Sequence, residues 1–135
     1  MYEEGHLIGN HTISSMSICR KSAAERLKKR LKLQMRRIKK ITGHETEFIR
    51  PPFGAMPEGE EDPDKIYVKW TVDSLDWVTK DTEKIVEKVT ADTKEGDVIL
   101  MHDCYGESVE AALQIVDIME KQGYEFVTAD ELIIN

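Results

Sequence analysis

The sequence predicts an α/β fold with a parallel sheet or a partial barrel. Two observations support this prediction: stretches with strand patterns alternate with stretches of helical periodicity, and polar residues cluster where the predicted strands end. At 135 residues the chain is long enough for one core, so we expect a single domain over residues 1–135.

The N-terminal half contains two predicted strands and a long helix. GHLIGNHT (5–12) is typical of a short strand that runs into a loop, and EFIRPPFG (47–54) of a brief strand that the two prolines end. Between them a basic helix is expected over 20–42, because apolar residues recur every three or four positions and Gly43 suits a C-cap. These apolar residues are Ala24, Leu27, Leu31, Met35, Ile38 and Ile41.

The C-terminal half alternates strands with amphipathic helices. KIYVKWTVD (65–73) predicts one strand, and TKDTEKIVEKVTADTK (79–94) a helix capped by Asp81 or Thr82. GDVILMHD (96–103) is an apolar run typical of a strand buried on both faces.

The end of the chain continues this alternation. ESVEAALQIVDIMEKQG (107–123) predicts an amphipathic helix stopped by Gly123. YEFVTADELI (124–133) predicts a last strand and a terminal turn.

Charge is unevenly distributed along the chain. The net charge of -7 argues against nucleic acid as the main partner, yet residues 20–40 hold eleven basic residues and one acidic residue. That segment is therefore +10 and the remainder -17. It is interpreted either as a solvated outer helix whose apolar stripe covers the sheet, which we prefer, or as a surface for an anionic membrane, cell-wall polymer or protein partner.

Several classes of protein are excluded by simple counts. Cys19 and Cys104 allow at most one bridge and match no zinc spacing, so free thiols are expected. No apolar run approaches a membrane span, and the N-terminus lacks the features of a secretory signal. As encoded, the chain is expected to be cytoplasmic.

Five polar residues follow predicted strands and suggest a site. In parallel α/β folds the active site gathers at the carboxyl ends of the strands. Imidazoles, an arginine and two carboxylates at one rim would suit metal-assisted hydrolysis, although each residue alone has an ordinary structural explanation. These residues are His11, Arg50, Asp73, Asp76 and His102.

Four segments, GHLIGNHTISS, FIRPPFG, WTVDSLDW and the stretch from VILMHDC to TADEL, resemble in order the motifs of the polysaccharide deacetylase family. The members of this family are the NodB-homology domains of carbohydrate esterase family four. The resemblance implies a distorted (β/α) barrel that removes acetyl groups from chitin-like, peptidoglycan or xylan polymers with a divalent metal, most often zinc. The chain begins about where the family's third strand would, so a barrel lacking its first strands is expected.

The resemblance assigns a metal ligand to His11, the first histidine of an HxxxH pair, but Ser15 stands where the second histidine is expected. A serine hydroxyl is a poor zinc ligand. The family's TFDDGP motif, which supplies the metal aspartate and the base aspartate, is absent from these residues. Metal binding is therefore expected to be weak or absent. His44 is interpreted as an exposed residue rather than a replacement ligand.

The resemblance also assigns roles on the acid side of the reaction. Arg50 orients the base carboxylate, His102 is the general acid, and Asp76 is its partner, since a carboxylate favours a protonated imidazole. The remaining matches are expected to contact the glycan. They are Pro51, Pro52 and Phe53 in the wall of the groove, Trp77 under the acetyl group, and Asp73.

Three hypotheses follow: a metal-dependent glycan deacetylase completed by an aspartate from elsewhere, a catalytically inactive relative that keeps the fold and a glycan groove, and an interaction protein using the basic helix. An open sheet edge beside His11 further predicts association, most simply as a homo-oligomer. Members of the family usually act at the cell wall or outside the cell. That location differs from the cytoplasmic one expected from the lack of an export signal in these residues.

Overall fold

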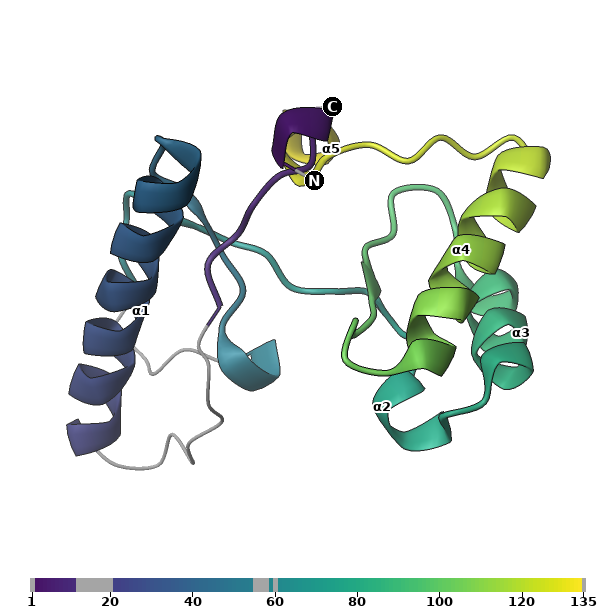
Figure 1. The fold of residues 1–135 in the computed structure, drawn as a ribbon, viewed down its shortest axis with the longest axis horizontal. Coiled ribbons are helices and arrows are strands. Elements are labelled where there is room, and N and C mark those ends of the chain that lie inside the picture. The colour runs from purple at the N-terminus through teal and green to yellow at the C-terminus, as the bar shows by residue number, and fades with distance from the viewer. Residues whose placement is uncertain (1, 12–20, 55–58, 60, 135) are drawn as a thin grey trace. The chain divides into compact units, whose positions relative to one another are not determined.

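The structure is a computed structural model that describes residues 2–11, 21–54, 59 and 61–134. It divides into two compact units, Met1–Lys69 and Trp70–Asn135 (Figure 1). The expectation of a single domain over 1–135 stays a prediction.

The first unit combines one long helix with a small parallel sheet. β1 pairs with β2 in parallel, with Phe48 opposite Ile66 and Ile49 opposite Tyr67. The strand predicted over 5–12 is reduced, among its described residues, to one parallel bridge between Asn10 and Ile49. The elements of this unit are η1 (Tyr2–Glu4), α1 (Lys21–Thr42), β1 (Phe48–Ile49), η2 (Pro52–Gly54) and β2 (Ile66–Tyr67).

The helix α1 confirms the basic helix that the periodicity predicts. Leu31 is buried in its middle, and the buried Asn10 side chain donates a hydrogen bond from Nδ2 to the Leu31 carbonyl oxygen at 2.9 Å. Ile41 was expected on the apolar face, but it is 83% exposed. The reason is angular: ten residues beyond Leu31, Ile41 lies about 80° around the helix from it.

The second unit carries two helices over a pair of parallel strands. β3 pairs with β4, with Val72 opposite Ile99 and Asp73 opposite Leu100. Its elements are β3 (Val72–Asp73), α2 (Asp76–Thr79), α3 (Thr82–Asp92), β4 (Ile99–Leu100), α4 (Gly106–Lys121) and α5 (Ala129–Ile134).

The core of this unit lies between α3 and α4, which are side by side in Figure 1. Of the two predicted caps, Asp81 is the one that caps α3, since its side chain accepts a hydrogen bond from the Lys84 backbone N–H. Half-buried Ile99 and Met101 pack against the core from β4 and the residue after it. The buried core residues are Ile85, Val89, Ala111, Ile115 and Met119.

Three strand predictions need correction. Residues 65–73 form two short strands instead of one, because the chain changes partner: Val68 donates its backbone N–H to the Ile49 carbonyl, and Thr71 donates to Val98. The 96–103 run yields only β4, which is half-buried, since α3 and α4 cover one of its faces.

The last predicted strand is also wrong. Residues 124–128 form no strand, because no described strand pairs with them, and 129–134 form α5. The Glu131 carboxylate accepts hydrogen bonds from both the backbone N–H and the hydroxyl of Thr128, at 2.9 and 2.8 Å. This side-chain contact at the start of the helix favours helix over the expected turn.

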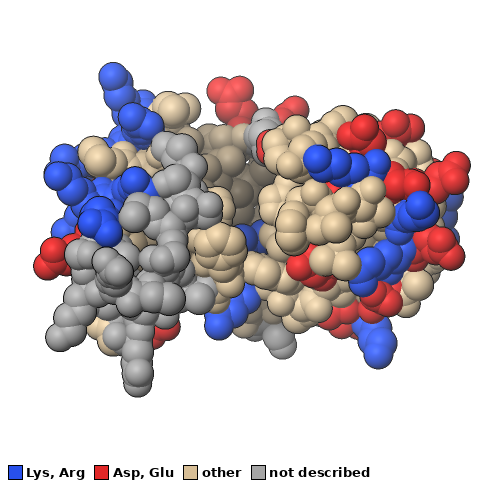
Figure 2. All heavy atoms as spheres, turned by 90° about the horizontal axis from the view of Figure 1, so that it is seen from below, with Lys and Arg blue, Asp and Glu red and all other residues tan. Residues whose placement is uncertain are grey.

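On the described surface, as in the sequence, basic side chains are concentrated on α1. In Figure 2, Lys and Arg side chains gather over α1, whereas acidic and basic side chains alternate over α3 and α4. None of the described helices is both long and apolar enough to cross a bilayer.

The core between α3 and α4 makes a stability prediction. Ile115→Ala should lower the free energy of unfolding by about 2–4 kcal/mol, because Ile115 is only 2% exposed and its truncation leaves a cavity. Leu113→Ala, on the same helix at 70% exposure, should change it by no more than about 0.5 kcal/mol. Urea unfolding followed by circular dichroism measures both. Equal losses for the two variants would contradict this packing.

Candidate active site

A buried carboxylate and a partly exposed histidine are hydrogen-bonded to each other in the second unit. One oxygen of Asp76, Oδ1, lies 2.8 Å from Nδ1 of His102, and the other, Oδ2, accepts the His102 backbone N–H at 2.7 Å. The two residues follow β3 and β4, whose parallel pairing brings these strand ends together. The carboxylate therefore fixes both the ring and the backbone of His102.

The environment of Asp76 keeps its carboxylate ionised. The side chain is 0% exposed, and Oδ1 also accepts the Trp77 backbone N–H at 2.9 Å. Burial alone would raise the pKa of the Asp76 carboxyl, but the hydrogen bonds from the ring and backbone N–H of His102 outweigh burial. They hold this pKa below its ordinary value of 3.8.

The pair defines the tautomer of His102. Because an ionised carboxylate can only accept, Nδ1 of His102 must carry the proton that it donates to Asp76. The other ring nitrogen, Nε2, is then left to exchange a proton with a ligand. The His102 side chain is 40% exposed, so a ligand in solution can reach it. The arrangement can act as a general acid or base.

The short helix that carries Asp76 is held by an unusual backbone. Leu75 before α2 and Lys80 after it both have left-handed conformations, with φ of 55° and 48°. Neither is a glycine, and an L-residue in this region costs roughly 1–2 kcal/mol. The Asp73 side chain supports the first bend, since its Oδ1 accepts the Leu75 N–H at 3.0 Å. Asp73, expected to contact substrate, is therefore engaged in a turn.

A second contact braces the loop after His102. The Lys80 ammonium lies 4.7 Å from the centre of the Tyr105 ring, a cation–π distance. This joins the end of α2 to the residue before α4. Leu75, Lys80 and Tyr105 were missed by sequence reasoning, because leucine and lysine carry no signal for positive φ and a cation–π contact depends on the fold.

The structure also shows the surroundings of Trp77 and Asp73, two further residues that the sequence predicted for the site. Trp77, expected beneath the acetyl group, is 52% exposed on α2. Asp73 and Leu75 line a shallow hollow of about 480 Å³ beside β3, whose other lining residues include charges of both signs. Neither Asp76 nor His102 lines this hollow.

The first unit brings together His11 and Arg50. Nδ1 of His11 lies 2.6 Å from the Arg50 carbonyl oxygen, and the Arg50 N–H donates to the Asn10 carbonyl at 2.9 Å. A carbonyl only accepts, so Nδ1 of His11 carries a proton, and in the neutral ring Nε2 then keeps its lone pair. Arg50 is half-buried, and burial lowers the pKa of its guanidinium from its ordinary value.

The segment after Arg50 exposes an aromatic ring. Pro51 and Pro52 are buried, whereas Phe53 is 70% exposed with a left-handed backbone of φ 57°. The prolines thus support the turn, and the phenylalanine projects from it. A strained, exposed aromatic residue is a candidate for ligand contact.

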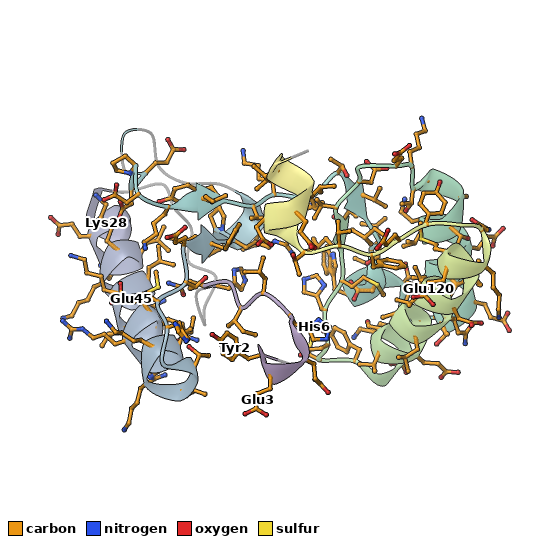
Figure 3. The ribbon with its side chains drawn as sticks, turned by 90° about the horizontal axis from the view of Figure 1, so that it is seen from above. Tyr2, Glu3, His6, Lys28, Glu45 and Glu120 are labelled. Carbon is orange, nitrogen blue, oxygen red and sulfur yellow. The ribbon has the colours of Figure 1, made fainter. Side chains whose placement is uncertain are left out.

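A complete metal site is not present in the part of the chain that the structure describes. No group of three or more His, Cys, Asp or Glu side chains is placed there to hold an ion. His11 fits one ligand, because its hydrogen bond through Nδ1 leaves Nε2 available. His6 (Figure 3) and His44 are exposed, as expected for His44. Ser15, at the expected second ligand position, lies outside the described residues.

Comparisons of the sequence and of the structure with known proteins agree on one family. A family model for polysaccharide deacetylases matches residues 1–65. The peptidoglycan-N-acetylmuramic acid deacetylase PdaC of Bacillus subtilis (strain 168) is 35% identical over 133 residues. This match covers 98% of the chain but 28% of the relative, so the chain spans less than a third of that protein.

Two solved structures are similar over nearly the whole chain. A polysaccharide deacetylase from Bacillus cereus has a TM-score of 0.79 at 32% identity, covering 94% of this chain and 68% of that one. A family 4 acetyl xylan esterase from Clostridium thermocellum, solved with a cobalt ion, has a TM-score of 0.85 at 28% identity, covering 99% of this chain and 67% of that one.

Because the pKa of Asp76 is lowered in the folded chain, its contribution to the free energy of unfolding should depend on pH. Its carboxyl titrates lower in the folded than in the unfolded chain, so its stabilisation is complete above pH 3.8 and is lost as the pH falls through the lower folded pKa. Asp76→Asn should cost about 1.5–3 kcal/mol at pH 7 and progressively less in acid.

Urea unfolding of the wild type and the variant at pH 7 and pH 3 tests this difference. The control is Asp117→Asn, because Asp117 forms only an exposed pair with Lys121 and should change stability by about 0.5 kcal/mol or less. A loss on Asp76→Asn that is identical at both pH values would show that Asp76 does not titrate as proposed.

Proposed function

Because the chain belongs to the polysaccharide deacetylase family, we propose that it forms the acid side of a hydrolase that removes acetyl groups from a glycan, most simply from peptidoglycan. The relative PdaC is a peptidoglycan deacetylase, which favours that glycan over chitin-like polymers or xylan. The likeness to solved family members over 94% of the chain confirms the predicted α/β fold class of the polysaccharide deacetylase type.

The observation that carries the proposal is the hydrogen bond between the buried Asp76 carboxylate and the partly exposed His102 ring. Breaking an acetamide requires a proton on the departing sugar nitrogen, since an amide anion is a poor leaving group. Protonated His102 holds one proton on Nδ1 against Asp76 and presents the other on Nε2. As the C–N bond breaks, Nε2 gives its proton to the nitrogen, and the ring becomes neutral while Nδ1 stays bonded to Asp76.

The residues of the first unit are proposed to serve the metal and the base. Deacetylases of this family are metal-dependent, and one solved relative holds cobalt. His11 would contribute Nε2 to a divalent cation, for which zinc is a good match to imidazole. When bound, such a cation polarises the acetyl carbonyl and an attacking water. Arg50 would orient the base carboxylate, and its half-buried guanidinium suits an acidic partner.

Glycan contact is proposed for the exposed aromatic residues Phe53 and Trp77. Both present more than half of their surface to solvent, and flat apolar rings pack well against sugar faces. Pro51 and Pro52 are proposed to shape the groove from beneath, because both are buried. Asp73 is proposed to act on substrate only through the turn that holds Leu75.

For this activity the base aspartate would come from a partner or an upstream segment, because these 135 residues contain no TFDDGP segment. Ser15 supports the second candidate function, a relative that binds glycan without hydrolysis, since serine replaces a histidine ligand there. Association of chains remains a further proposal. A stripe of exposed apolar residues on α4, Val109, Leu113 and Val116, supports it.

An activity assay separates these functions. The chain alone with zinc should release no acetate from an N-acetylglucosamine oligomer. Joined to an upstream segment that carries TFDDGP, and with Ser15→His, it should release acetate only when metal is present. In that background His102→Ala should lower kcat by about 10²–10⁴-fold, because the leaving nitrogen is no longer protonated.

The matched control is His44→Ala, which removes an exposed histidine and should leave the rate unchanged. A full rate for His102→Ala would refute the acid role. If the completed chain releases no acetate but still binds the oligomer, the second candidate function holds instead.

Phe53 provides a separate binding test. Phe53→Gly should weaken binding of the same oligomer by about tenfold, because a stacking surface is lost. It should not lower stability, since glycine adopts the positive φ without strain. Calorimetric titration and thermal unfolding measure the two effects. Unchanged affinity would remove Phe53 from the glycan site.

A further inference from the structure

The helix α1 presents a continuous row of exposed basic side chains that the proposed hydrolysis does not use. Lys29, Lys32, Arg36 and Lys40 recur every three or four residues and therefore lie along one side of the helix. Arg37 borders the row, and all five are exposed. We call these five residues the basic ridge. Figure 2 shows the gathering of positive charge over this helix.

The ridge is opposite the apolar side of the helix. Leu31 is buried, and Leu27, Met35 and Ile38 are half-buried, so this side of the helix is already partly covered. The hydrogen bond from Asn10 to the Leu31 carbonyl fixes this orientation. Glu25 is the one acidic residue of α1, and the nearby Lys39–Glu45 ion pair lies off the ridge. With one acidic residue on the whole helix, the ridge keeps a net positive charge.

We propose that the basic ridge docks a flexible anionic polymer of polyol phosphate units. Phosphate accepts hydrogen bonds from both the arginine fork and the lysine ammonium. The ridge residues recur about every 5 Å along the helix axis. A linear chain with phosphates at about that spacing meets one cation per repeat. A single small anion is a poor match, because exposed side chains spread along a line cannot enclose it.

Two other polyanions fit less well. Inserting into a membrane surface requires a continuous apolar face, whereas Leu33 and Ile41, the exposed large apolar residues of α1, are eight positions apart. Single-stranded nucleic acid is held by aromatic stacking, and α1 contains no Phe, Tyr or Trp. This inference is independent of the proposed hydrolysis.

Binding of a synthetic poly(glycerol phosphate) oligomer to the full chain, measured by calorimetric titration at 50 and 200 mM salt, tests the proposal. The chain should bind despite its net charge of -7, and its affinity should fall at least about tenfold at the higher salt, because neutralised phosphates release counterions. The triple variant Lys29→Gln, Lys32→Gln, Arg36→Gln should bind at least about tenfold more weakly and depend less on salt.

The matched control removes three positive charges elsewhere: Lys84→Gln, Lys88→Gln, Lys121→Gln. These lysines lie on α3 and α4 and pair with acidic neighbours, so affinity should change by no more than about twofold. Circular dichroism verifies that both triple variants keep their helices. Equal losses for the two variants, or no binding by the wild type, would overturn the proposal.

Two competitor probes complete the design. Phosphatidylglycerol vesicles and a single-stranded DNA oligomer of equal charge are titrated under the same conditions. Weaker binding of both supports a polyol phosphate polymer. Tighter binding of the vesicles or of the DNA would overturn the proposal in favour of a membrane or a nucleic acid.

Discussion

The carboxylate of Asp76 is the constraint on which the second unit depends. It is fully buried, and it accepts hydrogen bonds from the His102 ring, the His102 backbone and the Trp77 backbone. Since a buried charge without partners is unfavourable by several kcal/mol, the segments after β3 and β4 must stay together. Structure and chemistry therefore rely on the same contact.

This requirement explains why a strained backbone persists around α2. Leu75 and Lys80 hold left-handed conformations on either side of the helix, and the turn through Asp73 and the Lys80–Tyr105 contact stabilise them. The core between α3 and α4 also stabilises this unit through apolar burial, which helps to offset the backbone strain at Leu75 and Lys80. Phe53 shows the same pattern in the first unit, where two buried prolines support an exposed ring.

Local signals in the sequence predicted much of this. The period of the apolar residues located α1, α3 and α4, and Asp81 was one of two candidate caps for α3. The strand ends placed Asp76 and His102 at the same rim, whereas their pairing was implied by the family resemblance. Features that depend on distant partners were not predictable. Residues 65–73 change strand partner between Val68 and Thr71, and 124–128 find none among the described strands, although both stretches have strand composition. The left-handed residues Leu75 and Lys80 carry no local signal at all.

The central claim is that ionised Asp76 holds the proton of His102 on Nδ1 and leaves Nε2 to act on a ligand. Nitrogen NMR of the histidine rings measures this tautomer directly. At a pH where the His102 ring is neutral, the account predicts a protonated Nδ1 and an unprotonated Nε2, with this preference lost in Asp76→Asn. A neutral His102 with its proton on Nε2 in the wild type would contradict the account, because Nδ1 could then not donate to Asp76.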